Sequence, residues 1–363
     1  MPNVSRLPGV LSAPLRTVAG CVLSMGILGI AGTLSAQESD RVIPVEGRTL
    51  TGTITAVTAN GITIEVGGRV NEVEPSNIKM VTFANEPRDV VTARRALAEE
   101  RLNNALEALE PVDATRLQPA ALAADVRFMR AYCIAKLALT GEAGTLDEAA
   151  AAIGGFVASD KDSYRYFEAV ETFGDVLVAR GVFDQAEAQF GELVSAPWSE
   201  MQQRGRLKVA RTQELQKKFD EAVANYEAVM AVESATASSR QAKLSARVGL
   251  ARCAAFQGKA DEGIRDLQQM IVEESSTNTA LFAQIYNALG NCEMQAGNTK
   301  SAINAFLHTD LLYYQSPDYH AEALFQLGNL FAQIGKVAEA AEAREKLKSR
   351  YASSPWANAP ASN

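Results

Sequence analysis

The sequence predicts a mainly α fold, a solenoid of about six or seven helical hairpins that follows a small β-domain. Between residues 88 and 351, apolar residues recur at helical spacing, and proline and glycine are sparse. Within the same stretch a short pattern returns at intervals of 36 to 44 residues. Residues 50–83 differ, because their apolar side chains alternate with the period of two that is typical of strands.

Composition and charge limit the classes of partner. The chain carries 35 Lys and Arg against 43 Asp and Glu, which gives a net charge of −8 at pH 7, and 47% of its residues are hydrophobic. This hydrophobic fraction is that of a folded globular protein. Because a negative net charge disfavours a phosphate-binding surface, we do not expect nucleic acid as a partner.

The N-terminal segment has the order of features found in secretory signal peptides. Arg6 and Arg16 come first, an apolar stretch covers residues 18–31, and a cleavage site of small residues ends at Ala36. We therefore expect residues 1–36 to be a signal peptide that is removed after Ala36. The protein would then be exported to the periplasm or the cell envelope.

Two alternatives remain open for this segment. Left uncleaved, it would be an N-terminal membrane anchor, although its apolar run is shorter than the ~20 residues that a spanning helix needs and is interrupted by glycines. The residues Val-Ala-Gly-Cys that end at Cys21 also resemble a lipoprotein cleavage box. Cleavage there would make Cys21 a lipidated N-terminus.

Residues 41–86 are expected to form the small β-domain. Asn60-Gly61 and Gly67-Gly68 supply the positive φ values that tight hairpin turns need. In length and strand pattern the domain resembles an SH3-like or Sm-like half-barrel. It could bind a partner's strand at an open sheet edge or cap the first helix of the array, and we favour the cap. The alternating positions are Leu50, Gly52, Ile54, Ala56, Ile62, Ile64, Val66, Ile78, Val81 and Phe83.

Residues 88–355 are expected to form the helical array. In its clearest copies a turn residue precedes a small residue by five positions, and a large apolar residue follows the small one by four. The small residue would lie where the two helices of a hairpin touch, so a larger side chain would not fit there. The small residues are Ala105, Ala149, Ala186, Ala222, Gly263, Ala302 and Ala340.

This pattern resembles the turn and second helix of the tetratricopeptide repeat (TPR), with spacings longer than the family consensus. The resemblance implies stacked hairpins, a concave face and non-covalent binding of proteins or peptides. Residues 321–328, followed by Leu347, Tyr351 and Trp356, are similar to the last repeats of envelope TPR proteins associated with the Tol-Pal system and with outer-membrane assembly. Residues 356–363 should be a disordered tail.

No residue pattern predicts catalysis, a metal or a cofactor. Cys133, Cys253 and Cys292 occupy the same position of their first helices, so we expect buried core residues that lie too far apart for a disulfide. His308 and His320 lack a second ligand at helical spacing. We therefore expect a protein that is not an enzyme and that holds neither a metal nor a cofactor.

The concave face is the part of the array for which the TPR resemblance implies binding. Its second half is rich in arginine and asparagine, whose side chains can hold a carboxylate or the backbone of a peptide. We predict a peptide-binding groove there, and ordinary solvated surface is the alternative for the same residues. The predicted groove residues are Arg211, Arg252, Asn287, Asn291 and Asn329. The first half of the face would present Phe128, Tyr132, Glu171 and Asp175.

Together these features predict a non-enzymatic protein-binding scaffold or adaptor of the cell envelope. One alternative is an envelope assembly or cell-division-associated factor, which the C-terminal repeats alone suggest. Another is an accessory subunit that binds a glycan or a small molecule, for which the concave face offers few aromatic platforms.

Overall fold

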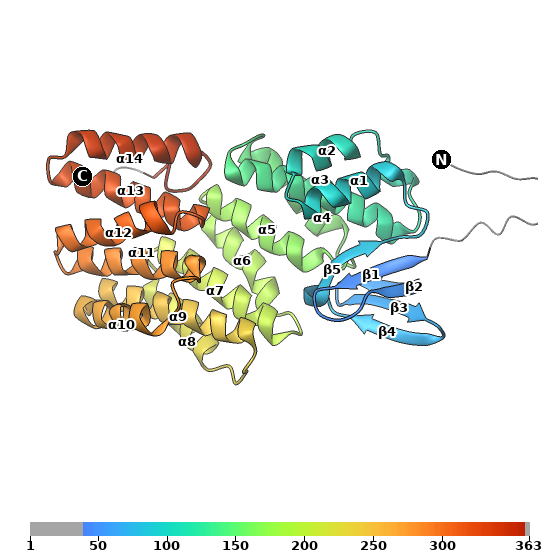
Figure 1. Cartoon of the computed structure of the whole chain (residues 1–363), viewed down its shortest axis with the longest axis horizontal. Coiled ribbons are helices and arrows are strands. Elements are labelled where there is room, and N and C mark those ends of the chain that lie inside the picture. Colours follow the sequence, from blue (N-terminus) through green and yellow to red (C-terminus); the bar gives the residue numbers. More distant parts are fainter. Residues whose placement is uncertain (1–38, 360–363) are drawn as a thin grey trace, which may run out of the picture. The chain divides into compact units, whose positions relative to one another are not determined.

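The computed structural model describes residues 39–359. The predicted signal peptide, its cleavage site at Ala36 and Cys21 lie outside the described residues. Along the described chain a five-stranded sheet is followed by fourteen α-helices (Figure 1). The mainly α fold with a small N-terminal β-domain is therefore confirmed.

The sheet is antiparallel, and its strands lie in the order β4-β3-β2-β1-β5. β2 and β3 are strands that the apolar alternation predicted, and Ile62 and Ile64 of β3 are buried. β1 and β4 carry no such alternation, and their pairing partners alone identify them. The strands are β1 (Asp40–Pro44), β2 (Leu50–Thr58), β3 (Gly61–Val66), β4 (Arg69–Val73) and β5 (Ile78–Thr82), with a 3-10 helix η1 (Pro75–Asn77) before β5.

Glycines shape the turns on either side of β3. Gly67 and Gly68, between β3 and β4, have φ values of +56° and +77°, as the hairpin prediction requires. The turn between β2 and β3 comes one residue earlier than predicted, because Gly61 already pairs with Thr58. Glycine is still needed at position 61, since a Cβ atom there would lie 2.2 Å from the carbonyl oxygen of Val73 on β4.

The helices of the described chain pair into seven hairpins, as predicted, and the helices of each pair contact one another. None of these helices is both long and apolar enough to cross a bilayer. The helices are α1 (Arg88–Ala98), α2 (Leu102–Leu109), α3 (Ala120–Thr140), α4 (Leu146–Ser159), α5 (Tyr166–Ala179), α6 (Phe183–Val194), α7 (Ser199–Leu215), α8 (Phe219–Met230), α9 (Ala237–Phe256), α10 (Ala260–Glu273), α11 (Thr279–Gln295), α12 (Thr299–Leu312), α13 (Pro317–Gln333) and α14 (Val337–Arg350).

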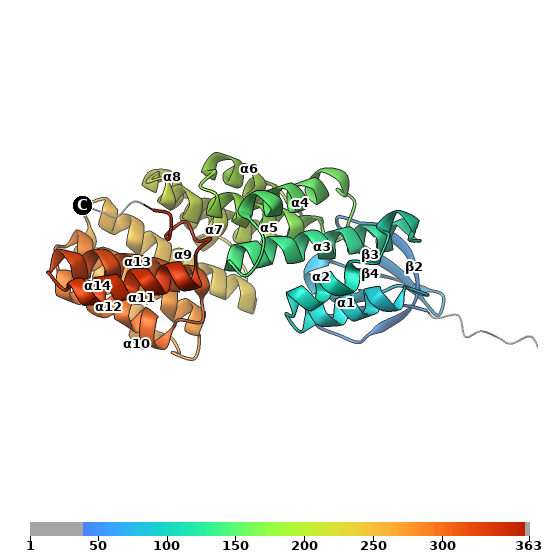
Figure 2. The same cartoon turned by 90° about the horizontal axis from the view of Figure 1, so that it is seen from above.

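The sheet shares one apolar core with the helices α1, α2 and α3, which lie on one side of it in Figure 1 and overlap it in the view from above (Figure 2). Val42, Ile64 and Val81 of the sheet are completely buried, and they belong to the same cluster as Val90 of α1 and Leu122 of α3. Without the sheet, the apolar face of the first hairpin would be exposed to water. This arrangement supports the capping role for the β-domain.

The predicted contact residues lie where paired helices approach most closely. Ala186, Ala222 and Ala302 are completely buried, and so are the other members of the series. Gly263 shows how little space there is, because a Cβ atom on it would lie 2.5 Å from the carbonyl oxygen of Ala251. The repeat register predicted from the sequence is therefore correct.

The turn residues of the hairpins have left-handed backbone conformations. Gly181, Gly258, Gly297 and Gly335 have φ values between +72° and +85°. Lys217 occupies the same place between α7 and α8, with φ at +62°. Because a side chain in this conformation costs roughly 1–2 kcal/mol, glycine is the expected residue and lysine is strained.

The cysteines are core residues, as predicted. Cys133, Cys253 and Cys292 are completely buried, and all three are free thiols. Burial raises the pKa of Cys133 and of Cys292 to about 12. Their thiolate forms are therefore scarce at neutral pH, and the thiols are poor nucleophiles.

The segment after α14 folds back onto α13. The rings of Trp356 and Phe325 lie 5.4 Å apart, and Trp356 and Ala357 pack against a buried cluster of α13 and α14 residues. The disordered tail predicted for residues 356–363 is therefore corrected for its first three residues, since the amide of Asn358 also donates to the backbone oxygens of Ala352 and Ser354. The cause is the open end of the last hairpin, whose apolar surface the tryptophan covers.

Candidate functional site

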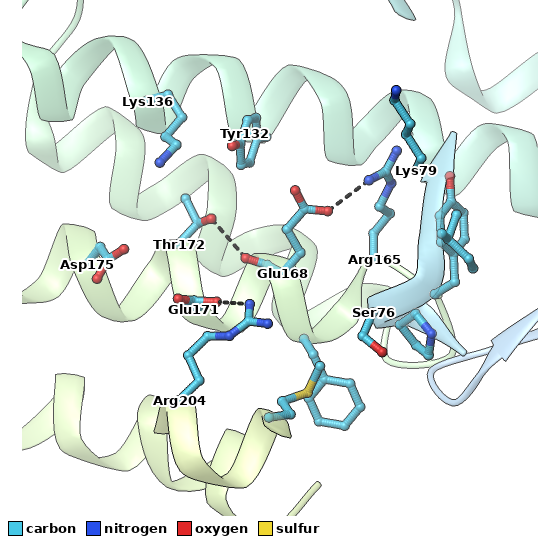
Figure 3. Close-up of a pocket in the computed structure, with 15 residues that line it drawn as sticks. Ser76, Lys79, Tyr132, Lys136, Arg165, Glu168, Glu171, Thr172, Asp175 and Arg204 are labelled. Carbon is cyan, nitrogen blue, oxygen red and sulfur yellow. Dashed lines mark hydrogen bonds and ion pairs between the residues drawn. The ribbon is translucent and has the colours of Figure 1, made fainter. Parts of the chain in front are cut away.

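A cleft of about 410 Å³ lies between the sheet and the first helices of three successive hairpins, α3, α5 and α7 (Figure 3). The end of η1 and the start of β5 form one wall, through Ser76 and Lys79. Most of the labelled side chains in the cleft are charged or carry hydroxyl groups. The cleft therefore differs from the mainly apolar pockets that enclose small molecules.

The wall formed by α3 presents Tyr132 and Lys136, which lie one helical turn apart. The Nζ atom of Lys136 lies 5.6 Å from the centre of the Tyr132 ring, a cation–π arrangement. Burial raises the pKa of Tyr132 to about 12. Its hydroxyl therefore stays protonated at neutral pH and can donate a hydrogen bond to a ligand.

The acidic side of the cleft comes from α5, and α7 supplies its counter-charges. Glu171 accepts a hydrogen bond from Nη1 of Arg204 at 3.0 Å, and Nζ of Lys208 lies 3.8 Å from the same carboxylate. Lys208 also donates to Asp175 at 2.6 Å. Burial raises the pKa of Asp175, and the Lys208 ammonium opposes this rise. Both carboxylates are thus already paired within the protein.

Arg165 marks the corner where the sheet meets α3 and α5. Its Nε atom donates to Asp125 at 3.1 Å, and its Nη1 atom donates to Glu168 at 2.8 Å. Its guanidinium lies 5.0 Å from the centre of the Phe128 ring. Phe128 is completely buried, so its predicted place on the concave face is wrong. The guanidinium of Arg165 covers the ring and makes it part of the core.

Two amines in the cleft, those of Lys79 and Lys136, have no acidic partner among residues 39–359. In contrast, Glu168, Glu171 and Asp175 each form an ion pair. The cleft therefore offers uncompensated positive charge in a chain whose net charge is −8. A ligand with negative charge would be attracted to these two amines.

Other groups that could support chemistry are engaged in structural contacts. No three His, Cys, Asp or Glu side chains come together as a metal site in the described part of the chain. Thr172 in the cleft donates its hydroxyl proton to the backbone oxygen of Glu168 at 2.8 Å. The buried His320 contacts Asp310 at 2.8 Å and Tyr351 at 2.7 Å, and it thereby joins α12 and α13 to the segment after α14.

The predicted groove residues lie on a row of first helices, α7, α9, α11 and α13, beyond the cleft. Nη1 of Arg211 donates to Glu214 at 2.8 Å, and Nη2 of Arg252 donates to the same carboxylate oxygen. Nη2 of Arg211 also donates to Glu322 on α13, at 2.5 Å. Neither buried glutamate was predicted. The contact with Glu322 has no local sequence signal, because Glu322 and Arg211 come from hairpins far apart in the sequence.

The three predicted asparagines extend this network along the row. Asn291 donates to Glu322, which also accepts from Arg211, at 3.1 Å. Asn287 donates to the backbone oxygen of Tyr319 at 2.7 Å. Asn329 is half-buried, and its Nδ2 atom has no hydrogen-bond partner among the described residues. Four of the five predicted residues thus make hydrogen bonds within the array. Peptide binding by all five stays a prediction.

Sequence reasoning found part of the cleft. It placed Tyr132, Glu171 and Asp175 on the concave face, and all three line the cleft. Helical spacing could have identified further cleft residues, because residues three or four positions apart lie on the same face of a helix. No sequence signal pointed to Lys79, because the position of the sheet decides its place. The cleft residues one helical turn from the predicted ones are Lys136, Glu168 and Thr172.

Comparisons with known proteins agree with this architecture. Residues 322–354 match the tetratricopeptide repeat family, and no curated protein matches the sequence. The chain is similar to the crystal structure of a tetratricopeptide repeat protein from Parabacteroides merdae, with 16% identity, a TM-score of 0.53, and coverage of 72% of this chain and 91% of that one. It is also similar to a Rap protein complexed with Competence and Sporulation Factor, with 13% identity, a TM-score of 0.50 and coverage of 74% of each chain.

Proposed function

We propose that this chain, a TPR-like solenoid by its fold, is a non-catalytic scaffold whose cleft receives an extended, acidic segment of a partner protein. The observation that carries the proposal is the pair of amines without acidic partners, Lys79 and Lys136, on two different walls of the cleft. A lysine amine is a flexible point charge with three donors, so it suits carboxylates whose positions vary along an extended chain.

The other cleft side chains suit the backbone of such a segment. The hydroxyls of Tyr132 and Ser76 can bond to peptide groups, and Arg204 is 45% exposed at its side chain. The walls belong to packed helices and to a sheet that shares their core. Little ordering of the protein is therefore needed on binding, which favours affinity.

The structural comparison supports the general kind of function. The Rap protein, whose fold is similar, was solved with Competence and Sporulation Factor bound. A helical solenoid of this kind can thus hold a partner molecule. The specificity proposed here depends on the charges of this chain's own cleft, which the comparison does not supply.

We also propose that the scaffold works in the cell envelope, where it could serve an assembly or cell-division process. This proposal depends on the signal-peptide pattern of residues 1–36 and on the C-terminal resemblance. Cell fractionation and N-terminal sequencing of the native protein test it. We expect an exported protein that begins at Gln37; an intact Met1 in the cytoplasmic fraction would contradict it.

The binding proposal is tested with a photo-crosslinking amino acid in place of Tyr132, in cells that produce the protein. The captured protein is identified by mass spectrometry, and the crosslinked segment should be rich in Asp and Glu. The double variant Lys79→Glu/Lys136→Glu should weaken its binding by about ten- to a hundredfold. Raising the salt concentration should weaken wild-type binding as well.

A matched control keeps the change in net charge the same. Lys259 and Lys300 are exposed and lie outside the cleft, so Lys259→Glu/Lys300→Glu should leave binding unchanged. Equal losses in the two double variants would show that the cleft does not select the partner. A crosslinked segment without acidic residues would contradict the proposed specificity.

A further inference from the structure

A second, smaller cavity of about 50 Å³ lies against the predicted groove residues, on the row of helices α7, α9, α11 and α13. Arg211 and Arg252 both line it. The cavity exceeds the roughly 10–15 Å³ that a single water molecule needs, and it is far smaller than the cleft. It can therefore hold a few water molecules or one small ion.

Arg252, which lines this cavity, has unused hydrogen-bond donors. Its residue is 5% exposed, and its Nε and Nη1 atoms are buried without a hydrogen-bond partner. Only its Nη2 atom is used, by Glu214. Leaving charged N–H groups buried and unpaired is costly, and such groups are uncommon in native structures.

Further donors line the same cavity. Tyr319, Ser245 and Gln284 also line it, and their side chains form no hydrogen bond with other described residues. Tyr226, which is also at the cavity, already donates its hydroxyl proton to Glu214 at 3.1 Å. The hydroxyls and the amide can donate hydrogen bonds to a bound group, and they can also accept them.

Every oxygen of the two neighbouring carboxylates already accepts at least one hydrogen bond from another group. Oε2 of Glu214 accepts from Arg211 and Arg252, and its Oε1 accepts from Tyr226 and from the thiol of Cys253. The two oxygens of Glu322 accept from Arg211 and from an asparagine of α11. Among the described residues none accepts a hydrogen bond from Nε or Nη1 of Arg252.

We propose that this cavity binds a small monoanion of carboxylate size, held by Arg252 with the hydroxyls of Tyr319 and Ser245. Arg211 adds positive charge at the same wall. The bound anion joins residues of α7, α9, α11 and α13 and so stabilises this row of helices against separation. The site is separate from the cleft, and the proposal does not depend on the function of the cleft.

The test is a titration of the purified full chain with formate and with acetate, followed by thermal unfolding. Sodium chloride, whose anion carries no carboxylate, keeps the ionic strength constant. Ligands with three or four heavy atoms reach at best an affinity of roughly 0.5 to 0.04 mM, so the titration runs from about 0.01 to 100 mM. We expect a saturable rise in the midpoint temperature, because a ligand that binds the folded state stabilises it.

Variants then place the anion. Arg252→Lys keeps a cation for Glu214 but removes the free guanidinium donors, and it should raise the apparent Kd at least about tenfold. Tyr319→Phe loses a single hydroxyl and should raise it about three- to tenfold, with folding retained. Arg247 lies on the same helix but pairs with Asp266, so Arg247→Lys should bind like the wild type.

The source of the anion is distinguished with N-acetylglycine, which carries its carboxylate on a peptide group. Tighter binding of N-acetylglycine than of acetate would assign the site to the carboxylate of a polypeptide end. The reverse order would assign it to a free small anion. A midpoint that does not respond to any of the three probes, or responds equally in Arg252→Lys, would overturn the proposal and leave water in the cavity.

Discussion

Arg211 on α7 and Glu322 on α13 are 111 positions apart in the sequence, yet Nη2 of the arginine donates to Oε2 of the glutamate at 2.5 Å. The glutamate side chain is 2% exposed, and that of the arginine is 25% exposed. The contact joins the fourth hairpin to the seventh. It shows that the first helices of hairpins that are not neighbours meet across the array.

Glu322→Gln tests how much this contact stabilises the array. The substitution keeps the shape of the side chain but removes the charge opposite Arg211, so the free energy of unfolding should fall by about 1–3 kcal/mol. Urea denaturation followed by circular dichroism measures it. Glu339→Gln is the control, because the Lys336–Glu339 pair is about half exposed and should contribute less than about 1 kcal/mol. Equal losses would show that the buried contact has no special weight.

Lys217→Gly should stabilise the protein. The lysine has φ at +62° and is exposed, so glycine removes the strain without removing a packed side chain. We expect the free energy of unfolding to rise by about 1 kcal/mol. Gly258→Ala at the equivalent turn should lower it by a similar amount. A destabilising Lys217→Gly would mean that the side chain makes a contact worth more than the strain.

Ala222→Leu tests the hairpin contact. Ala222 is completely buried between α8 and its partner helix, and three extra carbon atoms would force the helices apart, at a cost of about 1–3 kcal/mol. Ala224 lies on the exposed side of α8, so Ala224→Leu should change the midpoint temperature little. Thermal unfolding of both variants separates overpacking from the change in composition.

Asp125 should make the stability depend on pH. Burial alone would raise the pKa of this carboxyl, but the guanidiniums of Arg94 and Arg165 outweigh burial and lower it to about 2. Because the folded pKa lies below the unfolded value of about 3.9, the ionised form contributes about 2–3 kcal/mol at neutral pH. This contribution should decline as the pH falls from about 5 towards 2.

Asp125→Asn isolates this contribution. The variant should be less stable than the wild type at pH 7, and the difference should shrink as the pH is lowered. Urea denaturation at a series of pH values measures both proteins. A difference that stays constant from pH 7 to pH 3 would mean that the charge of Asp125 is not what stabilises the junction between the sheet, α1, α3 and α5.

The sequence by itself determined the repeat. The small contact residues such as Ala222, the turn glycines such as Gly258 and the buried cysteines were all predictable. Each depends on contacts within one hairpin or between neighbours, and such contacts recur at a fixed spacing that a single sequence displays. The same reasoning found Tyr132 and Glu171 in the cleft, because residues on one face of a helix follow its period.

Only the tertiary structure decided which polar residues meet. Lys79 reaches the cleft because the sheet packs beside α3, and Arg211 finds Glu322 because the array curves across three hairpins. Small rotations between successive hairpins add up to this curvature, and no local pattern records their sum. The arginines predicted for an open groove therefore already donate hydrogen bonds to buried glutamates. The two lysine amines without acidic partners lie in a cleft of which the sheet forms one wall.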